Sequence, residues 1–170
     1  MTLRNAVQKF KIIYYFDVVS PYACCSFFVL KRYMSHWNLD LVLKPVFLGG
    51  IMKLAENQPP AMHPLRAAYL EKDYLRNKQY FNLPEMCDEI PNNLFSAVAR
   101  KSLQVQRFLC YAFDKIDNEG DDDPRKNAIQ NKLALLQSFF EGVHCDKEGR
   151  LQNENQVLID DAWIMKKAER

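Results

Sequence analysis

The chain has 170 residues, of which 48% are hydrophobic and 26% are charged, and its formal net charge at pH 7 is +2. This length allows one domain, or a small core that carries a large insertion. The net charge is too small to indicate a nucleic-acid partner, and no apolar run approaches the roughly 20 residues that a membrane-spanning helix requires.

The N-terminal segment is basic. It carries Arg4, Lys9 and Lys11, and no acidic residue precedes Asp17. This pattern resembles a very short mitochondrial presequence. A basic tail that leads into a strand is the simpler interpretation, and we favour it.

A strand followed by a helix is predicted next. Residues 11–18 (KIIYYFDV) are rich in β-branched and aromatic side chains, which is typical of a buried strand. Ser20 and Pro21 then mark a helix start, because a small hydroxyl residue caps a helix and proline suits its first position. The helix is predicted to continue to Trp37. The residues spaced for one face of it are Phe27, Leu30, Met34 and Trp37.

A second strand completes the first folding unit. Residues 40–48 (DLVLKPVFL) alternate in the way of a strand. A helix between two strands predicts a βαβ unit whose strands are parallel. The following segment, 49–64 (GGIMKLAENQPPAMHP), contains repeated glycine and proline and predicts a loop.

The rest of the chain is predicted to be helical. Four helices are expected, from Pro64 to before Pro84 and over residues 93–113, 123–143 and 153–170. The apolar stripes on the second and third of these helices predict a bundle core. Its inward-facing positions are Val98, Val105, Phe108, Leu109, Ala112, Leu133, Leu136, Phe140 and Val143. The acidic run 117–124 lacks the pattern of an EF-hand loop and is predicted to be a solvated connector.

Cysteine and histidine residues give no sign of a metal site. The three histidines are far apart in the sequence, and the cysteines form no C-x-x-C pair. An odd number of scattered cysteines predicts reduced thiols inside a cell. The cysteines are Cys24, Cys25, Cys87, Cys110 and Cys145.

Ser20 is the candidate catalytic residue. A helix N-terminus has unsatisfied N–H groups and a partial positive charge, so it favours an anion. The slot of a redox C-x-x-C motif holds Ser20, Pro21, Tyr22 and Ala23 here, which excludes disulfide exchange by this motif. Two interpretations remain. Ser20 is simply a helix cap, or its hydroxyl donates a hydrogen bond to a thiolate that a substrate supplies.

Two motifs carry a family resemblance. They are D-x-x-S-P-Y in YYFDVVSPYA, and G-I-M-K with N-x-P-P in GGIMKLAENQPP. Together with the helical region, they resemble kappa-class glutathione transferases, whose lineage includes 2-hydroxychromene-2-carboxylate isomerases and bacterial disulfide oxidases. The resemblance implies an α/β fold, a thioredoxin-like βαβ unit with an inserted all-helical domain. Residues 1–63 would form the N-terminal half of the thioredoxin-like domain and residues 64–170 the helical domain.

The resemblance also implies the site residues. Ser20 matches the family serine that contacts the glutathione sulfur, and Pro21 and Tyr22 belong to the same turn. Asn57 matches the asparagine that helps to hold the glutathione backbone. No metal is implied. Lys53 and Arg66 are cations that could meet a glutathione carboxylate, an assignment made from their charge alone, and a solvated surface position explains either of them equally well.

The implied function is that of a glutathione transferase. Glutathione would be the co-substrate, and its activated thiol would be conjugated to small electrophiles in detoxification, or would reduce peroxides. Family membership further implies a homodimer in mitochondria or peroxisomes, with the cytosol left open. The alternatives are a glutathione-dependent isomerase of the same lineage and a non-catalytic thioredoxin-like partner or regulatory protein.

The chain also departs from the family. The G-x-P segment, two antiparallel strands, a Ser-Asp pair and a closing helix would be expected after the inserted helices, and none is found before Arg170. We therefore expect a chain that is truncated at its C-terminal end, with the C-terminal half of the thioredoxin fold absent. The first strand would then have an unpaired apolar edge, which is a site for an added strand from a partner.

Overall fold

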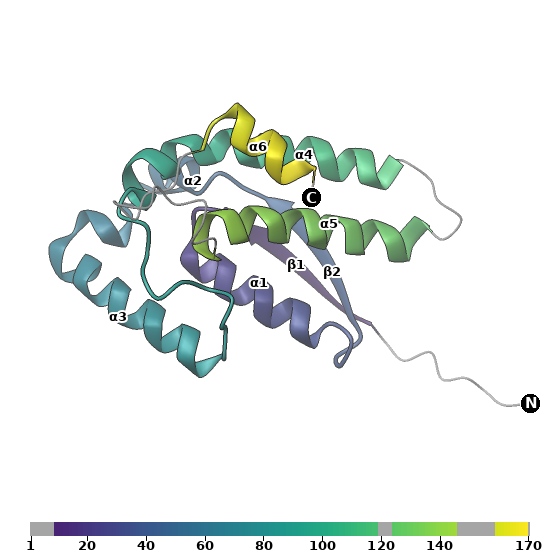
Figure 1. The fold of residues 1–170 in the computed structure, drawn as a ribbon, viewed down its shortest axis with the longest axis horizontal. Coiled ribbons are helices and arrows are strands. Elements are labelled where there is room, and N and C mark those ends of the chain that lie inside the picture. Colours follow the sequence, from purple (N-terminus) through teal and green to yellow (C-terminus); the bar gives the residue numbers. More distant parts are fainter. Residues whose placement is uncertain (1–8, 119–123, 146–158, 170) are drawn as a thin grey trace, which may run out of the picture.

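The computed structural model describes residues 9–118, 124–145 and 159–169. In this part of the chain, a two-stranded parallel sheet lies against a layer of helices (Figure 1). None of the helices in the described ranges is long and apolar enough to cross a membrane. Several sequence predictions concern residues outside these ranges, namely Arg4 of the basic N-terminal segment, most of the acidic connector with the cap Asp123, and residues 153–158 of the last helix.

The predicted βαβ unit is present. It consists of β1 (Phe10–Phe16), α1 (Pro21–Tyr33) and β2 (Leu39–Pro45). The strands are parallel, and their register pairs the first residue of one with the first residue of the other. Proline at the first position of α1 and Ser20 at its cap explain why the helix begins where the sequence predicts.

The end of α1 differs from the prediction. The helix stops at Tyr33, and a turn over residues 34–38 leads into β2. Asn38 has a φ of 48°, a left-handed conformation that asparagine tolerates better than most residues. Trp37 is consequently 54% exposed and stacks on Tyr33, with ring centroids 4.5 Å apart. The prediction that Trp37 belongs to the buried face was therefore wrong.

The predicted loop 49–64 contains a helix instead. It begins as α2 (Leu48–Leu54), and a 3-10 turn follows at Pro60–Met62. Gly49 and Gly50 weaken the helical signal in the sequence, because glycine is a poor helix former. Here they make room for an aromatic ring, since a Cβ atom on Gly50 would lie 2.9 Å from Cδ1 of Phe47.

The helical region follows the prediction except at two ends. Its elements are α3 (Pro64–Tyr80), a π turn (Leu94–Val98) that leads into α4 (Ala99–Asn118), α5 (Pro124–Phe140) with a π turn at Glu141–Cys145, and α6 (Asp161–Ala168). Helix α4 runs on to Asn118, past the predicted end at residue 113, and the last helix begins only at Asp161, because Asp160 is its extended cap. Most of the predicted inward positions are at most 1% exposed: Val98, Val105, Leu109, Leu133, Leu136, Phe140 and Val143. Phe108 and Ala112 are only partly buried.

One face of the sheet joins the helical core. Phe16 of β1 is 1% exposed and packs against Phe113 of α4 and Phe140 of α5, with ring centroids 6.4 and 6.1 Å apart. On the other face, Ile13 is 48% and Tyr15 is 64% exposed. Buried residues of β1, α1 and β2 therefore share a single hydrophobic cluster with those of α4 and α5. The division at residue 63 stays a prediction.

Candidate functional site

The turn between β1 and α1 presents the Ser20 hydroxyl. Ser20 has φ −82° and ψ 115°, the extended conformation of a helix cap, and its Oγ accepts a hydrogen bond from the Ala23 N–H at 3.2 Å. That contact uses the oxygen as an acceptor. Among the described residues, no acceptor engages the hydroxyl hydrogen, so Ser20 can cap α1 and still donate to a ligand.

One further donor of the first turn is available. Pro21 has no N–H, and the Ala23 N–H is capped by Ser20. The Cys24 N–H donates to the Ser20 carbonyl at 3.0 Å. Within the described part of the chain, this leaves the Tyr22 N–H as the donor without a backbone acceptor. A hydroxyl and a helix-terminal N–H thus stand close together, a combination that suits an anion.

Asp17 holds this turn from inside the protein. Its side chain is 3% exposed and accepts four hydrogen bonds. Oδ1 accepts from Val19 N at 3.2 Å and from Gln106 Nε2 at 2.9 Å. Oδ2 accepts from Leu48 N at 2.9 Å and from Ser102 Oγ at 3.2 Å. Burial raises the pKa of Asp17 above its usual range, and the four donors oppose that rise.

A second long-range contact holds the same turn. His144, which is 1% exposed, lies after α5, and its Nε2 is 2.9 Å from the carbonyl oxygen of Val18. A carbonyl only accepts, so Nε2 carries the proton and donates. Asp17 also contributes its own carbonyl, which accepts from Ser20 N at 3.0 Å. Residues 17–20 are therefore fixed by α2, α4 and the turn after α5.

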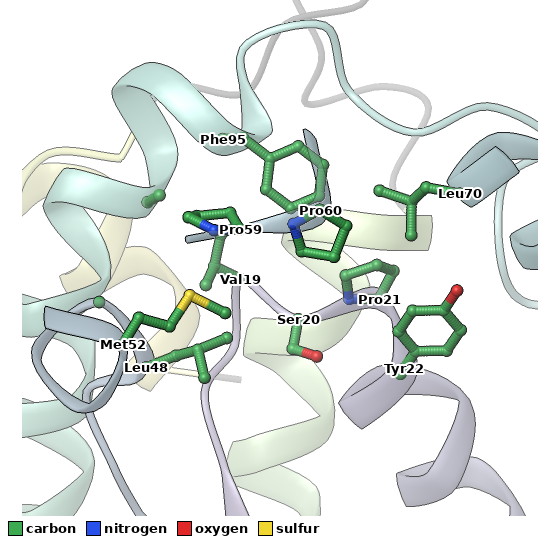
Figure 2. Close-up of a pocket in the computed structure, with 12 residues that line it drawn as sticks. Val19, Ser20, Pro21, Tyr22, Leu48, Met52, Pro59, Pro60, Leu70 and Phe95 are labelled. Carbon is green, nitrogen blue, oxygen red and sulfur yellow. The ribbon is translucent and has the colours of Figure 1, made fainter. Parts of the chain in front are cut away.

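Ser20 lines a cavity of about 200 Å³ (Figure 2). Its wall is almost entirely apolar, with side chains from the serine turn, α2, the 3-10 turn, α3 and the start of α4. These residues are Val19, Ser20, Pro21, Tyr22, Leu48, Gly49, Met52, Pro59, Pro60, Leu70, Phe95 and Ala99. The arrangement combines one hydroxyl donor with an apolar volume, which suits a small apolar ligand that has one anionic or polar atom.

Tyr22 is in the cavity wall, but its hydroxyl is engaged elsewhere. The hydroxyl donates to Asp73 Oδ2 on α3 at 2.7 Å, and in Figure 2 it points away from Ser20. Burial and the contact with Asp73 raise the pKa of Tyr22 above its ordinary value. Tyr22 therefore stays protonated, and its hydroxyl joins α1 to Asp73 on α3, while the side chain is 41% exposed. It lines the cavity as an apolar surface and does not act as a base.

The other predicted binding residues, Asn57, Lys53 and Arg66, do not line the cavity that contains Ser20. Asn57 is exposed, its Oδ1 accepts from Gln58 N at 2.8 Å, and it is not part of the cavity wall. Lys53 is exposed on α2. Arg66 lines an adjoining cavity of about 300 Å³, which shares Tyr22, Pro60 and Leu70 with the first. Of the predicted site residues, Ser20, Pro21 and Tyr22 therefore line the first cavity, and Arg66 lines the adjoining one.

The two cysteines of α1 are not nucleophiles. Cys24 is fully buried and Cys25 is 5% exposed. Burial raises the pKa of Cys24 and raises that of Cys25 to about 11. Both are thiols at neutral pH. The chemistry available at this helix start therefore depends on Ser20 and on a ligand.

Sequence reasoning missed the residues that hold the turn. Asp17 was visible as a carboxylate inside the largely apolar strand predicted over residues 11–18. Ser102 and Gln106 were visible as polar residues four apart beside the apolar stripe of α4, which is a sign of a buried polar contact. His144 had no local signal, because its partner Val18 lies 126 residues away.

Comparison with known proteins adds a family to this geometry. The family model for the DSBA-like thioredoxin domain matches residues 11–119. Glutathione S-transferase kappa 1 of Rattus norvegicus is 41% identical to the chain over 96 residues, which are 56% of this chain and 41% of that protein. The Homo sapiens protein of the same name is 34% identical over 96 residues, with the same shares.

A third relative is similar over a shorter stretch. Glutathione S-transferase kappa 1 of Caenorhabditis elegans is 36% identical over 75 residues, 44% of this chain and 33% of that protein. The resemblance stated from D-x-x-S-P-Y and its companion motif is confirmed by these similarities. The chain spans about two fifths of the length of the first two relatives that it matches.

Proposed function

Because this chain belongs to the family of DSBA-like thioredoxin domains, we propose that it is a glutathione transferase of the kappa type, in which Ser20 stabilises the thiolate of bound glutathione. The observation that carries this proposal is the Ser20 hydroxyl. Its oxygen caps α1 through the Ala23 N–H, and its hydrogen is left to donate into an apolar cavity.

The energy of such a contact is sufficient for the task. A hydrogen bond to a charged group is worth about 1.5–3 kcal/mol, which corresponds to about one to two pKa units. A thiol with a pKa of about 8.5 in water would therefore have a pKa of about 6.5–7.5 in the site, and a substantial fraction of it would be ionised at neutral pH. The partial positive charge at the start of α1 and the Tyr22 N–H act in the same direction.

The apolar cavity supports a small electrophile as the second substrate. In conjugation, the sulfur lone pair forms a bond to the electrophilic atom, and the leaving group departs with the electron pair. The protein contributes position and electrostatic stabilisation. Cys24 and Cys25 form no covalent intermediate with the substrate, since both are buried and protonated. Peroxides are the other class of acceptor that we propose.

Asn57, Lys53 and Arg66 complete the proposed glutathione site. Asn57 is exposed and lies two residues before the proline pair of the cavity wall. Arg66 lines the adjoining cavity, where a carboxylate would meet its guanidinium. These assignments rest on the family resemblance for Asn57, and on charge and place for the two cations.

Two other functions are kept as proposals of lower rank. A glutathione-dependent isomerase would use the same serine, and a cis–trans chromene substrate compared with a panel of electrophiles distinguishes it. A non-catalytic partner protein is favoured by the edge of β1 that, among the described residues, no second strand pairs with, because an open edge can accept a strand from a partner. We also propose, from the family resemblance, that the protein forms a homodimer and is located in mitochondria or peroxisomes.

Calorimetric titration of glutathione into the chain tests the main proposal. We expect saturable binding that weakens about tenfold or more in Ser20→Ala, since loss of the charge-assisted bond removes about 1.5–3 kcal/mol. Ser35→Ala is the matched control, because Ser35 is exposed in the turn beyond the other end of α1. Unchanged binding in Ser20→Ala, or no binding by a folded chain, would refute the proposal for this chain.

A further inference from the structure

We propose that Asp17 is a positioning residue, whose buried carboxylate sets the Ser20 hydroxyl against the cavity by joining the serine turn to α2 and α4. This inference rests on the proposed function and deepens it. It attributes the orientation of the Ser20 hydroxyl to Asp17, which does not itself line the cavity. Asp17 acts through Ser20 and is not itself a catalytic residue.

The first argument is that Asp17 connects two segments of the cavity wall. Its Oδ1 accepts from Val19 N at 3.2 Å, and Val19 and Ser20 form one side of the wall. Its Oδ2 accepts at 2.9 Å from the N–H of Leu48, the first residue of α2, which forms another side. One rigid carboxylate therefore sets the separation of these two segments.

The second argument is that the carboxylate is anchored to the core. Gln106 and Ser102 on α4 donate to it at 2.9 and 3.2 Å, and both are at most 3% exposed. Gln106 has its Oε1 atom buried, with no hydrogen-bond partner in the described residues. A buried unsatisfied atom is costly, so this amide is kept in place for the bond that its nitrogen makes to Asp17.

The third argument concerns the remaining polar groups of the turn. The Asp17 carbonyl accepts from Ser20 N at 3.0 Å, and the Val18 carbonyl accepts from His144 Nε2 at 2.9 Å. His144 fixes the position of the turn from the side of α5. Among the hydrogen bonds of the described residues, the Asp17 carboxylate is the group that joins the serine turn to α2.

The direction in which Asp17→Asn shifts the pKa of the bound glutathione thiol distinguishes a positioning effect of Asp17 from an effect of its charge. Replacing Asp17 with asparagine removes a negative charge near the proposed thiolate, and electrostatics alone would then lower the pKa of the bound glutathione thiol. Loss of positioning has the opposite effect. An asparagine NH₂ group would face donors that Asp17 now accepts from, the turn would shift, and a weaker bond from Ser20 would raise the thiol pKa.

The experiment is a pH titration of bound glutathione, followed by the ultraviolet absorbance of its thiolate, with kcat and KM measured beside it. We expect Asp17→Asn to raise the thiol pKa by about one pH unit, a tenfold loss of thiolate stabilisation. Asp40→Asn is the matched control, because Asp40 is exposed on β2, and it should leave the titration unchanged. A fall or no change in the thiol pKa of Asp17→Asn overturns the inference.

Two further variants keep the test decisive. If Asp17→Asn does not fold, Gln106→Met removes one of the four donors together with the unpartnered oxygen, and it should raise the thiol pKa by a smaller amount. An unchanged thiol pKa in Gln106→Met would then overturn the inference. In Gln106→Glu two carboxylates face each other, and adding Asp17→Asn should recover part of the lost activity, because the amide of residue 17 can donate to the new carboxylate.

Failure of the inference can be told apart from failure of the proposed function. If the unmodified chain does not lower the thiol pKa of glutathione, the proposed function fails. If it does so, and Ser20→Ala abolishes the effect while Asp17→Asn preserves it, the function stands and Asp17 has no positioning role.

Discussion

Ser20 and Asp17 lie in one turn and have complementary environments. The Ser20 oxygen accepts from the backbone of α1, and among the described residues no acceptor engages its hydrogen, which is free to donate to a ligand in the cavity. Asp17 is surrounded by donors alone and has no cation within hydrogen-bond distance among the described residues. A buried carboxylate without a counter-ion relies on such donors for its charge, so its titration should depend strongly on folding.

The stability of the protein should therefore respond to pH through Asp17. Burial raises the folded-state pKa of Asp17 above its unfolded value, which is about 3.9. The folded state thus binds more protons in the window above pH 3.9, and the contribution of Asp17 to stability falls as pH rises through the folded pKa. Urea unfolding at a series of pH values measures this.

The control for this prediction is Asp17→Asn, which cannot titrate. The unfolding free energy of the unmodified protein minus that of Asp17→Asn should decrease as the pH rises from the unfolded pKa of Asp17 to its folded pKa. A difference that stays constant, or that grows with pH, would show that the folded pKa of Asp17 is not raised.

At the scale of elements, α4 has two functions. Its apolar stripe forms the centre of the core, and two of its buried polar residues, Ser102 and Gln106, hold the serine turn. α2 depends on the same carboxylate, since it has no side-chain cap of its own and Asp17 accepts its first N–H. A short helix that lacks a local cap is stable only in its tertiary context.

The two leucines of α4 provide a matched test of its buried face. Leu109 is fully buried, whereas Leu103 on the same helix is 39% exposed. Leu109→Ala should lower the free energy of unfolding by about 2–5 kcal/mol, through lost burial and a residual cavity. Leu103→Ala should cost about 1 kcal/mol or less. Urea unfolding of both variants checks this, and equal losses would contradict the packing of α4.

At the scale of the whole molecule, one core joins the two predicted segments. Phe27 of α1 and Phe16 of β1 both pack on Phe140 of α5, with ring centroids 5.2 and 6.1 Å apart. Residues 1–63 and 64–170 therefore share buried surface. Neither segment encloses the aromatic cluster alone, and we expect them to unfold together.

The two tryptophans of the chain report on this cooperativity. Trp37 belongs to the first predicted segment and Trp163 to the second. In Trp163→Phe and Trp37→Phe, fluorescence follows one segment at a time during urea unfolding. We expect each variant's fluorescence transition to coincide with its own far-ultraviolet circular dichroism transition. If the fluorescence midpoint lies below the circular dichroism midpoint in one variant and above it in the other, the two segments are independent domains.

Much of the fold could be predicted from local sequence alone. The βαβ unit, the start of α1 at Pro21 and the start of α3 at Pro64 all follow from periodicity, capping and proline, which act within a few residues. The same local pattern identified Ser20 as a donor at a helix N-terminus. Helix α2 was not predicted, because Gly49 and Gly50 weaken its helical signal. The reason for these glycines is the Phe47 ring packed against them, which only the structure shows.

The sequence by itself determined most of the elements and the serine, and tertiary structure decided what surrounds that serine. Asp17 meets Leu48, Ser102 and Gln106 across 31, 85 and 89 residues. Hydrophobic burial, which drives these helices together, has no direction and leaves no local pattern that pairs one distant polar residue with another. The partners of the turn and the cavity that it faces therefore appear only when the core is packed.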